Sequence, residues 1–141
     1  MEKSFSQSFT IEGRNFSNAG RASTEIKGIL KQLGLNSGVI RKVAIAMYEA
    51  EMNVAMYAQR ATMTFEVSPR WIKVVVDDEG PGIPDIDLAM QEGYSTATVE
   101  MREMGFGAGM GLPNIKRNSD EFAIQSVVGR GTRVEITVYI N

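Results

Sequence analysis

One long amphipathic segment, NSGVIRKVAIAMYEAEMNVAMYAQ, limits the possible folds of this chain more than any other feature. Asn36 or Ser37 at its start can accept hydrogen bonds from the free N–H groups of a first helical turn. Apolar side chains then recur at helical spacing and form one stripe, made of Val39, Ile40, Val43, Ala46, Met47, Ala50 and Val54. Because an amphipathic helix buries such a stripe, the pattern predicts one long helix with a single buried side.

Shorter segments on both sides of this helix show either strand or helix patterns. The predicted elements are, in chain order, a strand over 3–12, a helix within 15–35, the long helix, two strands within 61–80, a short helix near 84–91, a helix within 110–120 and a closing hairpin within 121–141. The strand pair turns at 68–70 and the closing hairpin at 129–131, where proline or glycine favours a turn. Since the helices form separate blocks, this order predicts an α+β two-layer sandwich.

The composition removes several classes of function. The chain has 141 residues, about the length of one domain, so residues 1–141 are expected to form a single domain. It contains no cysteine and no histidine, which excludes disulfides, thiol catalysis, zinc–thiolate and histidine metal sites, Ser-His-Asp triads and phosphohistidine chemistry within this chain. The net charge of −2 argues against a dedicated nucleic-acid binder. With no apolar signal segment and no run of membrane-spanning length, a soluble cytoplasmic protein is expected.

The segment MGFGAGMGLPNIKRN places glycine at alternate positions, namely Gly105, Gly107, Gly109 and Gly111. A dinucleotide-binding fingerprint would need a glycine at Met110 or Leu112, and the phosphate loop ending in Gly-Lys-Ser/Thr is absent as well. The remaining pattern, Gly-x-Gly-x-Gly-Leu before a helix, exposes backbone N–H groups that suit an anion such as a triphosphate. A flexible loop closed by a tight turn is the alternative. The long polar stretch before these glycines is typical of a lid over a ligand.

A second motif, Glu49-x-x-x-Asn53, lies within the long predicted helix. A spacing of four residues places both side chains on one face of the helix, at the edge of its apolar stripe. A carboxylate beside an amide oxygen can hold a hard cation such as Mg²⁺ and keep a base nearby. The alternative is a polar surface strip. Glu51 falls on roughly the opposite face of the helix and is expected to be solvated.

A third motif, Asp78-Glu79-Gly80-Pro81-Gly82, follows the predicted strand WIKVVV. An aspartate at the end of a strand can accept a hydrogen bond from an exocyclic amine such as the amino group of adenine. The two glycines would let the backbone approach a flat base closely. The alternative is an ordinary turn at the end of a strand, for which Asp, Gly and Pro are all common residues.

Together, in this order and spacing, the motifs resemble those of the Bergerat-fold (GHKL) ATPase superfamily, the histidine kinase-like ATPase domain shared by gyrase, histidine kinases and MutL. The matching positions are Glu49 and Asn53 in the N box, Asp78, Gly80 and Gly82 in the first glycine box, Gly107, Gly109, Gly111 and Leu112 in the second, and Gly131 and Thr132 in the final Gly-Thr element. The resemblance implies a mixed, mostly antiparallel sheet covered by helices on one face. It also implies ATP and Mg²⁺ as cofactors.

The same resemblance implies a role for each matching position. Glu49 would act as the general base, Asn53 would ligate Mg²⁺, and Asp78 would bind adenine. The glycines of the second box would wrap the triphosphate, and Thr132 would lie near the adenine-binding aspartate. The sequence departs from the family pattern at Val54 and Tyr57, where the family often has alanine and histidine, and its nearest basic residue before the second glycine box is Arg102.

Length and composition favour one branch of this superfamily. The chain has no room for the extra domain of gyrase and MutL relatives, and it lacks the phosphoacceptor histidine of a complete sensor kinase. It looks most like the single-domain anti-sigma factor serine kinases of bacterial sporulation and stress control (the SpoIIAB/RsbW type). This branch implies a sigma factor and an anti-sigma factor antagonist as partners, phosphorylation of an antagonist serine, and a homodimer, without direct nucleic-acid or membrane binding. A nucleotide-dependent binding module without phosphotransfer and a detached ATP-binding half of a split histidine kinase are the alternatives.

Overall fold

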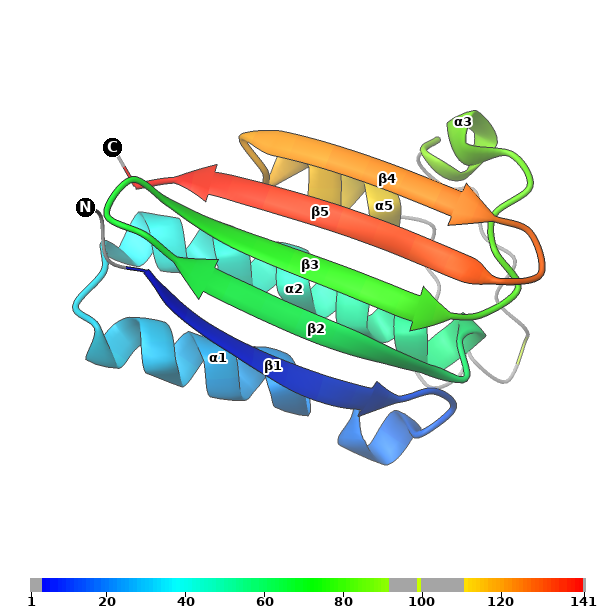
Figure 1. Cartoon of the computed structure of the whole chain (residues 1–141), viewed down its shortest axis with the longest axis horizontal. Coiled ribbons are helices and arrows are strands. Elements are labelled where there is room, and N and C mark those ends of the chain that lie inside the picture. The colour runs from blue at the N-terminus through cyan, green and yellow to red at the C-terminus, as the bar shows by residue number, and fades with distance from the viewer. Residues whose placement is uncertain (1–3, 92–98, 100–110, 141) are drawn as a thin grey trace.

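The computed structural model describes residues 4–91, 99 and 111–140, and its strands form one five-stranded sheet (Figure 1). In chain order the strands are β1 (Phe5–Glu12), β2 (Arg60–Val67), β3 (Trp71–Glu79), β4 (Glu121–Val127) and β5 (Gly131–Tyr139). Their order across the sheet is β1-β2-β3-β5-β4, and every neighbouring pair is antiparallel. The sheet expected to be mixed therefore has no parallel pair among the described strands. After β1, two successive helices bring the chain back to the end of that strand, where Arg60 pairs with Glu12. Strand β2 therefore runs antiparallel to β1.

The helices α1, α2 and α5 lie on one face of this sheet (Figure 1), and the arrangement confirms the α+β sandwich predicted from the sequence. The helical elements are the 3-10 turn η1 (Phe16–Asn18), α1 (Arg21–Gln32), α2 (Ser37–Tyr57), α3 (Ile86–Ala89) and α5 (Gly111–Arg117). Helix α2 lies between α1 and α5. Its first turn is capped by Asn36, whose side-chain oxygen accepts hydrogen bonds from the N–H groups of Gly38 and Val39.

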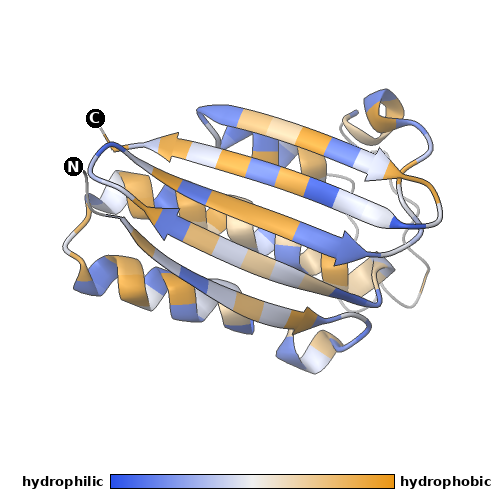
Figure 2. Ribbon diagram, viewed as in Figure 1, coloured by the Kyte–Doolittle hydropathy of each residue, from blue (hydrophilic) through white to orange (hydrophobic). Residues whose placement is uncertain are grey.

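Hydrophobic and hydrophilic residues alternate along the strands (Figure 2), and the sheet buries one face and exposes the other. In β3, Ile72, Val74 and Val76 are buried beneath the helices, while the residues between them are at least partly exposed. On the open face, polar side chains pair across neighbouring strands. Ser8 and Thr64 share a hydrogen bond of 2.8 Å, and Arg133 forms an ion pair of 2.7 Å with Asp77. The open face therefore needs no covering layer.

A single apolar core fills the space between the sheet and the helices. The largest fully buried apolar side chains are Phe65, Ile26, Leu30, Met47, Met63, Ile72, Ile115 and Ile136. They come from α1, α2 and α5 and from the inner face of β2, β3 and β5, so this cluster holds the three helices to the sheet. Among the described residues, no helix combines the length and apolar character needed to cross a membrane.

Candidate functional site

Glu49 and Asn53 lie one turn apart on α2 and face the beginning of α5. The side-chain amide of Asn114 on α5 donates a hydrogen bond of 3.3 Å to Oε1 of Glu49. Gly111, the first residue of α5, lies so close to Asn53 that a Cβ atom there would be 3.0 Å from Asn53 Oδ1. Both side chains of the motif are partly exposed. The motif from the middle of the chain and the last glycine of the glycine-rich segment thus meet at one place.

Asp78 lies near the end of β3, and its carboxylate contacts the beginning of β5. The backbone N–H of Thr132 donates a hydrogen bond of 2.9 Å to Asp78 Oδ1. Gly131 makes this contact possible, because its φ is 153° and a Cβ atom would lie 2.0 Å from the backbone oxygen of Asp78. Partial burial raises the pKa of the Asp78 carboxyl, the charge of Asp77 acts in the same direction, and the hydrogen bond from Thr132 opposes both.

The turn after Asp78 is tied to the hairpin between β4 and β5. The N–H of Ile83 donates a hydrogen bond of 2.7 Å to Ser126 Oγ, which also shares one of 2.9 Å with Thr132 Oγ1. The N–H of Gly129 donates to the backbone oxygen of Pro81 at 2.8 Å. Gly82, with a φ of 78°, fits against Val127 in this turn. The first glycine box and the Gly-Thr element therefore form one hydrogen-bonded unit.

The end of α2 connects the two parts of the site. Gly80 packs against Ala58, the residue that follows α2, since a Cβ atom at Gly80 would lie 3.2 Å from Ala58 Cα. The N–H of Gln59 donates a hydrogen bond of 2.7 Å to the backbone oxygen of Glu79. The pairing of β2 with β3 brings the motif on α2 and the motif after β3 to the same end of the molecule.

Glu51 is not solvated, and the expectation from the sequence was wrong. Its side chain is 1% exposed and accepts hydrogen bonds from the N–H groups of Gly20, Ala22 and Ser23 and from the Ser23 hydroxyl, at 2.6–3.2 Å. The residue before α1 is Gly20, which has no side chain to cap the helix. The carboxylate from α2 takes that role and satisfies the free N–H groups at the positive end of α1.

Of the other predicted site residues, some lie in the described part of the chain and others do not. Leu112 is half-buried and packs against the core, and Tyr57 is the half-buried last residue of α2. Arg102, Gly105, Gly107 and Gly109 lie outside the described residues. Within the part of the chain that is described, no group of three or more acidic side chains is arranged to hold a metal ion.

Sequence reasoning missed Asn114 and Ser126. The role of Ser126 could have been expected from the sequence. It alternates with Phe122 and Ile124 on the inward-facing side of β4, where a polar side chain needs a hydrogen-bond partner. No local sequence pattern indicates the role of Asn114, because its contact with Glu49 joins residues 65 positions apart.

The fold and these motifs define a histidine kinase-like ATPase domain, and the chain belongs to that family. The family model matches residues 15–138, which includes every motif described above.

Among curated proteins, the chain is 33% identical over 113 residues to the serine/threonine-protein kinase RsbT of Bacillus subtilis (strain 168), covering 77% of this chain and 79% of that protein. It is 32% identical over 128 residues to the anti-sigma F factor of Thermoanaerobacter sp. (strain X514), covering 87% and 86% of the two chains. The anti-sigma F factor of Caldanaerobacter subterraneus subsp. tengcongensis is 31% identical over 128 residues, with the same coverage.

Proposed function

We propose that this chain is an ATP-dependent protein-serine kinase of the anti-sigma factor type, which transfers the γ-phosphate of ATP to a serine of a partner antagonist protein and sequesters a sigma factor. The meeting of Glu49 and Asn53 with the start of α5 is the observation that carries this proposal. It places a carboxylate and an amide oxygen close to Gly111, the last glycine of the glycine-rich segment, in a family of ATPase domains. Relatives named as a serine/threonine-protein kinase and as anti-sigma F factors support the same function.

We assign adenine recognition to Asp78. The hydrogen bond from Thr132 N–H fixes the orientation of the carboxylate by occupying Oδ1. A carboxylate held in this way can accept a hydrogen bond from the exocyclic amine of adenine. Gly80 and Gly82 would let the backbone lie against the base, because neither carries a side chain. The glycines at positions 107, 109 and 111, together with Leu112, would surround the triphosphate.

We assign the chemical step to Glu49. The hydroxyl oxygen of the acceptor serine would attack the γ-phosphorus, the bond from that phosphorus to the bridging oxygen of ADP would break, and Glu49 would take the hydroxyl proton. Asn114 would hold the carboxylate of Glu49 toward the acceptor. Asn53 would be the protein ligand of Mg²⁺, which supplies charge neutralisation of the phosphates when it is bound.

The proposal includes partners and a location. A sigma factor and an antagonist protein with a phosphorylatable serine are the partners expected for this function, and a homodimer is the expected assembly. We place the protein in the cytoplasm and treat residues 1–141 as one functional domain.

Phosphotransfer with γ-labelled ATP tests the proposal directly. The protein is incubated with candidate antagonist proteins and the labelled residue is mapped, with Glu49→Ala as the test variant and Glu25→Ala, at an exposed position on α1, as the matched control. Label on a partner serine that is lost only in Glu49→Ala supports the kinase. Bound ATP without transfer to any partner would instead identify a regulatory binding module. An acid-labile label on a partner histidine would identify the ATP-binding half of a split histidine kinase.

A further inference from the structure

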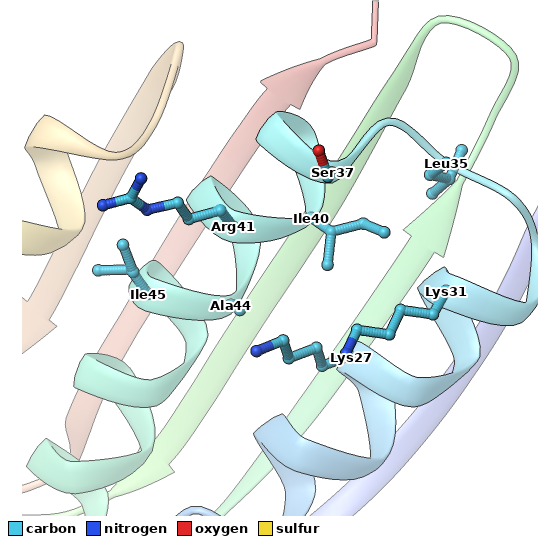
Figure 3. A pocket seen from close by; sticks show the side chains of 8 residues that line it. All are labelled: Lys27, Lys31, Leu35, Ser37, Ile40, Arg41, Ala44 and Ile45. Atoms are coloured by element: carbon cyan, nitrogen blue, oxygen red, sulfur yellow. The ribbon is translucent and has the colours of Figure 1, made fainter.

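A groove of about 550 Å³ runs along the outer side of α1 and α2, away from the sheet (Figure 3). It lies between the second half of α1 and the first half of α2. Glu49 lies further along α2 and contacts Asn114 of α5, one helical turn after Ile45, which lines the groove. None of the motif residues described above lines the groove.

Three cationic side chains line this groove, namely Lys27 and Lys31 from α1 and Arg41 from α2 (Figure 3). All three are exposed, and no carboxylate is among the lining residues. Over residues 4–91, 99 and 111–140, none of the three has an acidic side chain within ion-pair distance. Lys42, one position after Arg41, is by contrast paired with Asp120 at 2.9 Å. The groove thus carries a local positive charge on a chain whose net charge is −2.

Apart from Ser37, the other side chains that line the groove are apolar. Leu35, Ala44 and Ile45 are half-buried there, and Ile40 is 5% exposed.

The combination of an apolar strip with flanking cations matches one kind of partner. An amphipathic helix can lay its apolar side chains into such a groove while acidic side chains on its flanks pair with the cations. The stretch from Ser37 to Ile45 rises about 12 Å along α2, so it would accommodate about two turns of such a helix. A nucleic acid would need a longer track of cations than the three present, and it would not use the apolar strip.

We propose that the groove between α1 and α2 is a docking surface for an acidic amphipathic helix of a partner protein. This inference goes beyond the proposed kinase function and does not depend on phosphotransfer. It assigns a partner-binding role to the second half of α1 and the first half of α2.

A designed peptide provides a direct probe. The peptide has about 18 residues with leucine at helical spacing on one face and glutamate on the others, and a fluorescent label reports binding by anisotropy. A scrambled peptide of the same composition removes the apolar face, and a peptide with lysine in place of glutamate reverses the charge. The acidic amphipathic peptide should bind the full chain, more weakly as salt is added, while the other two should bind at least about tenfold more weakly.

Variants of the full chain locate the binding. Lys27→Glu/Lys31→Glu should weaken binding of the acidic peptide about tenfold or more, and Ile45→Asp should weaken it similarly through the apolar strip. Lys73→Glu on the open face of the sheet is the charge control and should leave binding unchanged. Circular dichroism of each variant shows whether it is folded. If the double variant does not fold, Lys31→Glu alone, at an exposed position, provides the same test.

Three results would overturn the docking proposal. Equal binding of the peptide by the parent chain and by folded Lys31→Glu and Lys27→Glu/Lys31→Glu would remove the groove from the interaction. Equal binding of the scrambled peptide would show attraction of charge alone. Binding of phosphatidylserine vesicles or single-stranded RNA that depends on Lys27 and Lys31, without binding of the peptide, would identify a different kind of partner. ATP binding measured on the same samples separates these failures from failure of the proposed kinase function.

Discussion

Helix α2 carries two carboxylates two positions apart, and their surroundings are opposite. Glu51, on the side facing α1, is 1% exposed and accepts hydrogen bonds from three backbone N–H groups and one hydroxyl. Glu49, on the side facing α5, is partly exposed, and one described hydrogen bond, 3.3 Å long, reaches it from Asn114. The first carboxylate has its hydrogen-bonding capacity filled by the protein, whereas the second has room for a ligand. The comparison indicates a structural role for Glu51 and a catalytic role for Glu49.

The largest effect is expected from Glu49→Ala, and it should fall on activity alone. Loss of a general base slows a reaction about 10²–10⁴-fold, which corresponds to about 3–5 kcal/mol of activation free energy. The free energy of unfolding should change by less than about 1 kcal/mol, because a partly exposed side chain loses one long hydrogen bond. Phosphotransfer rates and urea unfolding measure the two effects separately. An unfolding midpoint that drops far below that of the parent would contradict the contrast with Glu51.

The next largest effect is expected from Glu51→Ala, and it should fall on stability. The substitution leaves the N–H groups of Gly20, Ala22 and Ser23 without their acceptor at a buried helix end. We expect a loss of about 3 kcal/mol in the free energy of unfolding, from the lost cap and the unsatisfied donors. Glu25→Ala, at an exposed position on α1, should change it by less than about 0.5 kcal/mol. A loss of under about 1 kcal/mol for Glu51→Ala would show that the buried carboxylate is not needed to hold α1.

A smaller effect is expected from Asp78→Asn. This variant should bind ATP more weakly without becoming less stable. ATP affinity should fall at least about tenfold, because an amide accepts hydrogen bonds less strongly than a carboxylate. Stability at pH 7 should not fall, since burial raises the pKa of Asp78 and makes its ionised form the less favourable one in the folded protein. The Glu25→Ala variant, at an exposed position on α1, serves as the binding control. ATP titration and thermal unfolding of the same samples give both quantities, and unchanged ATP affinity would disprove the adenine assignment.

The same residue predicts a pH dependence. A carboxyl with a raised pKa in the folded state binds its proton more readily there than in the unfolded chain. Its contribution to stability is therefore most favourable below the ordinary value of 3.8 and is lost as the pH rises through the raised pKa. The parent chain should become more stable relative to Asp78→Asn as the pH is lowered through this range, in unfolding curves measured at a series of pH values. A difference that stays constant with pH would contradict the effect of burial on this carboxyl.

The smallest effect on stability is expected from Asp120→Asn. Asp120 lies between α5 and β4 and forms an ion pair with Lys42 of α2. Hydrogen bonds from Lys42 and from the N–H of Tyr139 lower the pKa of the Asp120 carboxyl. A lowered pKa means that the stabilisation is present above the ordinary value of 3.8 and is lost as the pH falls through the lowered value. Because this ion pair is exposed to solvent, the variant should lose less than about 1 kcal/mol at pH 7. Unfolding measured at pH 7 and at about pH 2.5 should show the difference disappear at the lower pH.

Much of the fold was predictable because the signals are local. The apolar stripe from Val39 to Val54 defines α2, and the alternation around Ile72, Val74 and Val76 defines β3. The contacts of Asn53 with Gly111 and of Asp78 with Thr132 agree with the expected proximity of these motifs. The all-antiparallel sheet was not predicted, since the direction of β2 depends on how α1 and α2 return the chain to the end of β1.

The sequence by itself determined the elements, the family and the set of polar residues available for nucleotide chemistry, because periodicity and motif spacing are properties of neighbouring residues. The tertiary structure alone decided what each polar residue does. Helical spacing places Glu49 and Glu51 on different sides of α2, but it does not say that the N-terminus of α1 covers one side while the other stays open beside α5. It also could not indicate the cationic groove, which is lined by residues of both α1 and α2 and forms only where these helices pack together. The burial and the partners of a side chain depend on distant segments, and packing brings those segments together.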